Sequence, residues 1–186
     1  VPTMNSSGTV VGDDFTPFDQ AALNSGDTDV ASGGVLLLPD SVGGGNGQHQ
    51  LVQAGKTGRV FVLNRENLGG YTPGNGSDPQ VKATAGGMWA MPAYWNGNIY
   101  IWGINDHLKA YSFINGSLST APTSTSNEGL QASAIPAVSS NGTTNGIVWA
   151  VNTFNHEVFY AYDASNVSNM LYNSGQNSAR DFPGPD

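Results

Sequence analysis

The chain has 186 residues, with 6 Lys or Arg against 14 Asp or Glu, and its formal net charge at pH 7 is −8. This acidic balance argues against nucleic acids and anionic membrane surfaces as partners, because both require clustered cations. The absence of cysteine excludes disulfides, thiolate metal sites and thiol nucleophiles, and no apolar run is long enough to span a membrane.

Charged residues make up only 11% of the chain, well below the roughly 25% of an average domain. Glycine, asparagine, serine and threonine fill the polar positions, a pattern typical of an all-β protein with many short strands. We expect a secreted, extracellular or periplasmic protein. The sequence begins without a signal peptide, which predicts either a processed form or a fragment.

Residues 1–32 are an irregular lead-in, in which residues 19–23 can form no more than one helical turn. The first strand-rich unit is residues 33–85. It opens with Val35-Leu36-Leu37-Leu38, a short apolar run that predicts a strand buried on both faces. Strands at 50–54 and 58–64 follow, joined by a turn that contains Lys56.

The second unit, residues 86–130, has two Asn-Gly pairs between strand-like segments, which is the strongest short hairpin signal. Its expected strands are residues 92–95, 98–102, 108–113 and a polar segment, 117–120. The third unit, residues 131–186, has a loop that ends in Asn145-Gly146. Its expected strands are 135–138, 147–151, 158–163 and 169–172.

These units repeat with a period of about 44–51 residues: Pro92 and Pro136 are 44 residues apart, and Ala110 and Ala161 are 51 apart. A repeat of this length, made of four short antiparallel strands, predicts the blades of a β-propeller. Closed propellers have four to eight blades, so three blades predict a partial propeller. The partner is then the remaining blades of the same protein or another copy of the chain.

Two segments resemble the quinoprotein dehydrogenases, which are propellers that bind pyrroloquinoline quinone (PQQ) and calcium. One runs from Asp27-Thr28-Asp29-Val30 to Gly58-Arg59-Val60-Phe61-Val62-Leu63-Asn64-Arg65, and the other is Ala161-Tyr162-Asp163-Ala164. The chain also resembles secreted PQQ-repeat propeller proteins, most strongly over residues 15–40. The resemblance implies that Lys56 occupies the position of the basic residue that contacts the quinone. It also implies PQQ as a cofactor.

The chain departs from that family in two places. The adjacent cysteine pair near the cofactor is missing, and Tyr172 stands where the repeats end in tryptophan.

The carboxylates of Asp27 and Asp29 alternate in a glycine-rich loop, a pattern that can supply oxygen ligands to Ca²⁺. The other interpretation is that these aspartates cap turns by accepting backbone hydrogen bonds. The three histidines, 49, 107 and 156, are candidates for a metal ligand or a base. His107 and His156 lie at similar places in successive units.

Trp102 and Trp149 also lie at similar places in successive units and are expected in the core. Trp89 follows Gly86-Gly87, and we expect it to face the propeller channel, where it could contact a cofactor or a sugar. Five N-x-S/T sequons would be glycosylation sites in a eukaryotic secreted protein: Asn5, Asn75, Asn115, Asn141 and Asn166.

Three functions remain open. The leading interpretation is a propeller segment with a binding or scaffold role, in which a small molecule or a glycan contacts the channel-facing loops. The second is a fragment of a PQQ- and calcium-dependent dehydrogenase, whose catalytic residues this sequence does not identify. The third is a carbohydrate-binding propeller that uses Trp89.

Overall fold

The computed structural model describes residues 3–4, 10–43, 49–71, 73, 78, 81–154 and 157–181. Antiparallel β-sheet dominates these residues, so the predicted all-β class is confirmed; the sheets are open and none closes on itself. The helices are short: α1 (Gln20–Ser25), η1 (Asp40–Val42), η2 (Ser174–Asn177) and α2 (Ser178–Asp181). No helix in the described part of the chain is long and apolar enough to cross a membrane.

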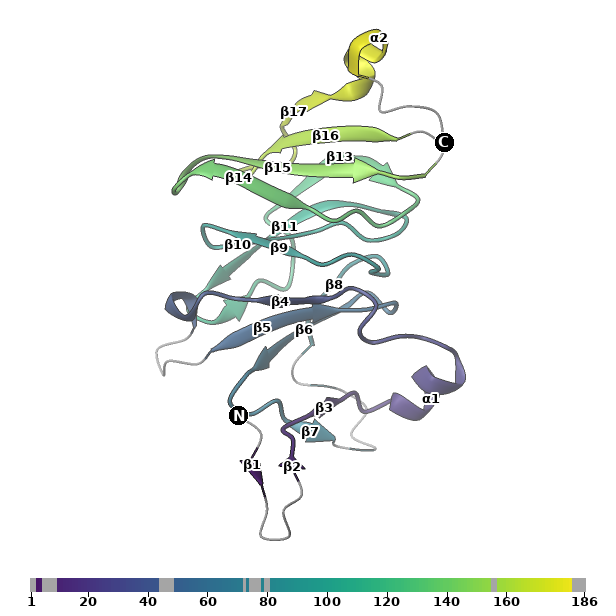
Figure 1. Cartoon of the computed structure of the whole chain (residues 1–186), viewed down its shortest axis with the longest axis vertical. Coiled ribbons are helices and arrows are strands. Elements are labelled where there is room, and N and C mark those ends of the chain that lie inside the picture. Colours follow the sequence, from purple (N-terminus) through teal and green to yellow (C-terminus); the bar gives the residue numbers. More distant parts are fainter. Residues whose placement is uncertain are drawn as a thin grey trace.

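Three sheets follow one another along the chain and are stacked in the same order (Figure 1). The first sheet has the order β4 (Val35–Leu37), β5 (Gln50–Ala54), β6 (Arg59–Asn64) and β8 (Val81–Thr84). The second has β9 (Ala93–Trp95), β10 (Asn98–Ile101), β11 (Asp106–Ile114) and β12 (Ser117–Leu118), and β13 (Ser124–Leu130) also pairs with β11. The third has β14 (Ala137–Asn141), β15 (Thr144–Asn152), β16 (Val158–Asp163) and β17 (Met170–Asn173).

The hairpin turns of the second sheet confirm the Asn-Gly signals. Asn96 and Gly97 have φ angles of 44° and 78°, and Asn115 and Gly116 have 51° and 75°. Positive φ at both central residues gives a tight turn whose twist matches the flanking strands, and asparagine and glycine tolerate it best. In the third sheet the loop predicted to end in Asn145-Gly146 ends earlier: β14 runs to Asn141, β15 begins at Thr144, and the turn lies between them.

The second sheet is buried on both faces because side chains alternate along a strand. On β10, Ile99 and Ile101 enter the core shared with the first sheet, whereas Tyr100 enters the core shared with the third. All three are completely buried. The strand is therefore apolar throughout, as expected of a strand between two layers.

The far face of the first sheet is covered by the lead-in. Phe15, in β3 (Phe15–Thr16), packs against Phe61 with ring centroids 5.0 Å apart, and Arg59 pairs with Asp19 at 2.9 Å. The strand β3 pairs in parallel with β7 (Gly70–Tyr71). A further hairpin, β1 (Thr3–Met4) with β2 (Val10–Val11), precedes it. The lead-in thus closes one end of the stack (Figure 1).

Two strand predictions need correction. The strand β4 is not buried on both faces: Val35 and Leu37 are exposed, because they lie at the edge of the far face, beside the part over β5 and β6 that the lead-in covers. The predicted polar strand at 117–120 shortens to β12, and β13 takes most of the pairing with β11.

Candidate functional site

The first strands of the three sheets, β4, β9 and β14, are free edges on the same side of the stack. The edges of the first two sheets lie close together just before β4 and β9, since a Cβ placed on Gly34 would lie 3.3 Å from the Met91 side chain. The edges of the second and third sheets meet where β9 contacts β14. Large exposed apolar side chains gather on or just before these strands: Val35, Leu37, Trp89, Met91 and Ile135. Such a concentration of exposed apolar surface marks a candidate interaction site.

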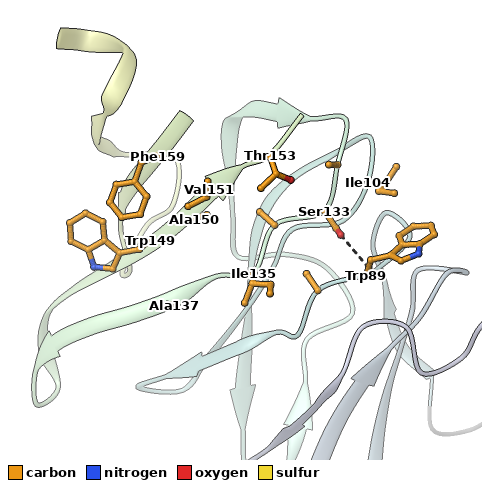
Figure 2. Close-up of a pocket in the computed structure, with 13 residues that line it drawn as sticks. Trp89, Ile104, Ser133, Ile135, Ala137, Trp149, Ala150, Val151, Thr153 and Phe159 are labelled. Atoms are coloured by element: carbon orange, nitrogen blue, oxygen red, sulfur yellow. Dashed lines mark hydrogen bonds between the residues drawn. The ribbon is translucent and has the colours of Figure 1, made fainter. Parts of the chain in front are cut away.

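An open cleft of about 710 Å³ lies along this side, next to the second and third sheets (Figure 2). We call it the edge cleft. Its lining is mainly apolar and comprises Trp89, Ala90, Ile104, Ala132, Ser133, Ala134, Ile135, Ala137, Trp149, Ala150, Val151, Thr153 and Phe159. Among the described residues, no titratable side chain belongs to this lining. Its side-chain hydroxyls are those of Ser133 and Thr153.

Trp89 forms one end of the edge cleft. Its side chain is 48% exposed, whereas Met88 and Ala90 on either side are buried. The backbone N–H of Trp89 donates a hydrogen bond to the Ser133 hydroxyl at 3.3 Å (Figure 2). The indole lies close to Gly87, where an added Cβ would come within 3.1 Å of the ring. The backbone of this exposed tryptophan is therefore held by Ser133, and its ring lies beside Gly87.

Trp149 and Phe159 form the other end of the cleft. Their rings stack with centroids 5.2 Å apart and an interplanar angle of 13°. The indole N–H of Trp149 donates to the Ser139 hydroxyl at 2.8 Å. The core prediction is confirmed for Trp102, which is completely buried, but is wrong for Trp149, which lies on the outer face of the third sheet and is only partly buried.

Lys56, Asp27 and Asp29 form one ion cluster. The Lys56 ammonium lies 2.9 Å from the Asp29 carboxylate and 3.6 Å from that of Asp27, and it donates to the Asp27 carbonyl at 2.7 Å. The hydrogen bond to Asp29 is the main cause that raises the pKa of Lys56 above its ordinary value. The residues predicted to bind an anion and a calcium ion therefore pair with one another.

Lys56 and Trp89, the two residues predicted to contact a cofactor, lie on segments that are close together in space. A Cβ on Gly87 would lie 2.7 Å from the Lys56 carbonyl, so the Lys56 turn adjoins the segment that carries Trp89. Calcium at Asp27 and Asp29 stays a prediction. Among the described residues, no group of three or more His, Asp or Glu side chains is arranged to hold a metal ion.

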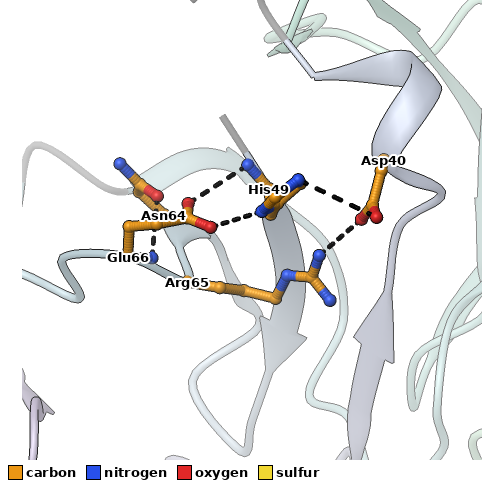
Figure 3. Close-up of polar contacts among 5 residues, drawn as sticks. All are labelled: Asp40, His49, Asn64, Arg65 and Glu66. Carbon is orange, nitrogen blue, oxygen red and sulfur yellow. Dashed lines mark hydrogen bonds and ion pairs between the residues drawn. The ribbon is translucent and has the colours of Figure 1, made fainter. Parts of the chain in front are cut away.

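A second polar cluster lies at the end of the first sheet (Figure 3). His49 Nδ1 contacts the Glu66 carboxylate, its Nε2 lies 3.8 Å from Asp40, and Arg65 bonds Asp40 at 2.5 Å. The hydrogen bond from His49 is the main cause that lowers the pKa of Glu66. These contacts join η1 to the two ends of the β5–β6 hairpin at the surface. His107 lies on β11, away from His49, and His156 is outside the described residues.

Three of the predicted sequons lie in the described part of the chain. Asn115, Asn141 and Asn166 are all exposed, as a glycan acceptor must be, whereas Asn5 and Asn75 lie outside the described residues. The side-chain oxygen of Asn166 accepts hydrogen bonds from the Ser168 N–H and hydroxyl.

The glycine-rich segment before Trp89 singled out this residue in the sequence, but the other residues of the edge cleft were not predicted. Ile104 and Ser133 carry no local signal, because only the stacking of the second and third sheets brings them to the cleft. The repeat gave one signal for the cleft. Ile135 lies 44 residues, or one repeat, after Met91, and both side chains are exposed just before equivalent edge strands. Searches of protein-family models, curated proteins and solved structures found no match to this chain.

Proposed function

We propose that the protein is a secreted binding module built from propeller-type blades, and that a saccharide is its ligand in the edge cleft. Three successive antiparallel sheets of four, five and four strands, stacked face to face with their first strands on one side, support the propeller part of the proposal. In a propeller those first strands line the central channel. The edge cleft lies on that side.

The exposure of Trp89 is the observation that carries the binding function. Burying an indole is strongly favourable, so a half-exposed tryptophan whose backbone is bonded to Ser133 and whose ring lies beside Gly87 offers an apolar surface to a ligand. A sugar ring has an apolar face that fits such a surface, and its hydroxyls would find partners in Ser133 and Thr153.

The chemistry of the lining favours binding over catalysis at this cleft. General acid–base catalysis needs a titratable side chain within hydrogen-bond reach of the reacting group. In the described part of the chain, the side chains that line the edge cleft carry no titratable group, and their polar groups are two hydroxyls and two indole N–H groups. The hydrogen-bonding groups are therefore suited to orienting a neutral ligand.

The test is a titration of soluble oligosaccharides followed by tryptophan fluorescence. We expect at least one saccharide to bind, and Trp89→Ala to weaken binding about tenfold or more, as for an aromatic anchor. Ile114→Ala is the matched control, because Ile114 is also exposed but lies outside the cleft. If no saccharide binds, or if Trp89→Ala binds as well as the unmodified protein, the proposal fails. The same titration with PQQ and Ca²⁺ tests the dehydrogenase hypothesis.

A further inference from the structure

A second open cleft, of about 520 Å³, lies where the turn between β9 and β10 meets the turn between β14 and β15. Its lining comes from the second and third sheets and includes Trp95, Asn98, Asn145, Gly146, Asp163 and Ser165. We call it the turn cleft. Among the described residues, none lines both this cleft and the edge cleft. The turn cleft is therefore a separate site, and its lining carries amide, hydroxyl and carboxylate groups.

The Trp95 side chain forms a fixed wall of the turn cleft. Its indole N–H donates to the Gly142 carbonyl at 2.9 Å, and the neighbouring Asn96 amide donates to the Thr143 carbonyl at 3.3 Å. The Trp95 ring lies against Gly146, where an added Cβ would come within 2.6 Å of it. The φ angle of Gly146 is not positive, so the close approach of the ring, rather than the backbone conformation, requires glycine there. The cleft thus has an aromatic surface whose position is set by contacts with the third sheet.

The Asp163 carboxylate supplies the charge of the turn cleft, since the described lining holds no other charged residue. Its Oδ1 accepts hydrogen bonds from the Ser165 N–H at 2.8 Å and the Ser165 hydroxyl at 2.6 Å. The bond from the Ser165 hydroxyl is the main cause that lowers the pKa of Asp163, and further hydrogen bonds from Asn166 and Asn169 lower it as well. These bonds hold the carboxylate in place and ionised at neutral pH, but they bring no positive charge to it.

Asp163 also lacks the counter-ion that other carboxylates of the protein have. Within the described ranges, Asp29 pairs with Lys56 and Asp106 pairs with Lys109, but no ion pair includes Asp163. The formal net charge of −8 attracts cations to the protein from a distance. An ionised carboxylate and an indole in one cleft favour a cationic ligand, because the first offers an ion pair and the second a cation–π contact.

We propose that the turn cleft binds a small molecule with a primary ammonium group, which pairs with Asp163 while the carbon skeleton of the ligand lies on Trp95. An ammonium group has three hydrogen-bond donors, and the side-chain oxygens of Asn98 and Asn145 supply further acceptors in the same lining. This site goes beyond the saccharide binding proposed for the edge cleft. Because the two clefts have different linings, either proposal can fail while the other stands.

Cyclohexylamine and cyclohexanol are a matched pair of probes, since they share a ring and differ in the charged group. Proton–nitrogen correlation NMR spectra follow each titration residue by residue. We expect cyclohexylamine to shift the Trp95 indole signal and the Ser165 amide signal, and cyclohexanol to bind about tenfold more weakly or not at all. The proposal is overturned if the amine does not bind, if both probes bind equally, or if the shifted signals lie outside the turn cleft.

The matched variants are Asp163→Asn and Asp27→Asn, because each removes one negative charge and Asp27 is exposed outside this cleft. We expect Asp163→Asn to weaken cyclohexylamine binding about tenfold and Asp27→Asn to leave it almost unchanged. Asparagine keeps an oxygen that can accept the Ser165 bonds, and circular dichroism checks the fold. Trp95→Leu is the second variant and should also weaken binding. Equal losses in the two aspartate variants would mean that the amine follows net charge, which contradicts a site at Asp163.

A cross-comparison separates this site from the edge cleft. We expect Trp89→Ala to bind cyclohexylamine as well as the unmodified protein does, and Asp163→Asn to leave the binding of a neutral saccharide unchanged. Loss of amine binding in Trp89→Ala would place the amine in the edge cleft and would also overturn the proposal.

Discussion

At the start of β11, the carboxylate of Asp106 accepts three hydrogen bonds. They come from the Lys109 ammonium at 2.6 Å and from the backbone N–H groups of Gly86 and His107 at 2.7 and 2.8 Å. Burial alone would raise the pKa of Asp106, but these hydrogen bonds outweigh it and hold the pKa below its ordinary value. Since Gly86 precedes the second sheet and follows the first, this carboxylate ties the two together.

Replacing Asp106 with asparagine is expected to lower the free energy of unfolding at pH 7 by about 1–3 kcal/mol, because charge-assisted hydrogen bonds are lost. A carboxyl whose pKa is lowered by folding stabilises the protein above its unfolded pKa of about 3.9. That stability is lost as the pH falls through the folded value. The difference between Asp106→Asn and the unmodified protein should therefore shrink below about pH 4.

Urea unfolding at several pH values measures this effect. Asp27→Asn is the control, because the Asp27 side chain is 97% exposed and its ion pair lies at the surface. A difference between Asp106→Asn and the unmodified protein that stays constant from pH 7 to pH 3 would show that the charge of Asp106 is not what stabilises the fold.

Among the elements, the lead-in has a role that its irregular sequence does not reveal. Its strand β3 lies next to the first sheet, with helix α1 to one side (Figure 1); Phe15 packs on Phe61, and Arg59 lies over the Phe18 ring at 5.8 Å. The short helical turn was predictable from residues 19–23. The contact with the sheet was not, because it joins residues more than 40 positions apart.

Phe15→Ala is expected to cost about 1–3 kcal/mol of unfolding free energy, since it removes part of the cover over Phe61. Tyr71→Ala is the matched control: Tyr71 pairs with Thr16 across the same small sheet but is 48% exposed, and its loss should cost well under 1 kcal/mol. Chemical denaturation compares the two variants. Equal losses would mean that the lead-in acts through its backbone pairing and not as a cover.

Strands were predictable where apolar residues concentrate, and missed where they do not. The bounds of β5 and β16 agree with the apolar segments 50–54 and 158–163. The strand β13, Ser124–Leu130, is mostly polar, and its pairing with β11 comes from the fold rather than from its own pattern. The exposure of Val35 and Leu37 on β4 was not predicted for a related reason. An apolar run indicates that a strand exists, but it does not indicate which layers cover that strand.

For the whole molecule, the repeat predicted strand-rich units of about the right length, and the structure places three stacked sheets along the chain. The middle sheet is buried between two apolar cores, whereas β4 and β14 are free edges. The edge cleft arises only from this stacking. Beyond Trp89 and the repeat spacing that relates Ile135 to Met91, no sequence pattern identified its members.

Residue-level backbone hydrogen exchange tests this arrangement most directly, because protection reports the burial and pairing of each strand. We predict the slowest exchange in β10, Asn98–Ile101, which pairs on both sides and is covered on both faces. Amides of β4 and β14 that point away from their only neighbour should exchange faster, by on the order of a hundredfold or more. Equal protection of β10 and those edge amides would contradict the stack of open sheets.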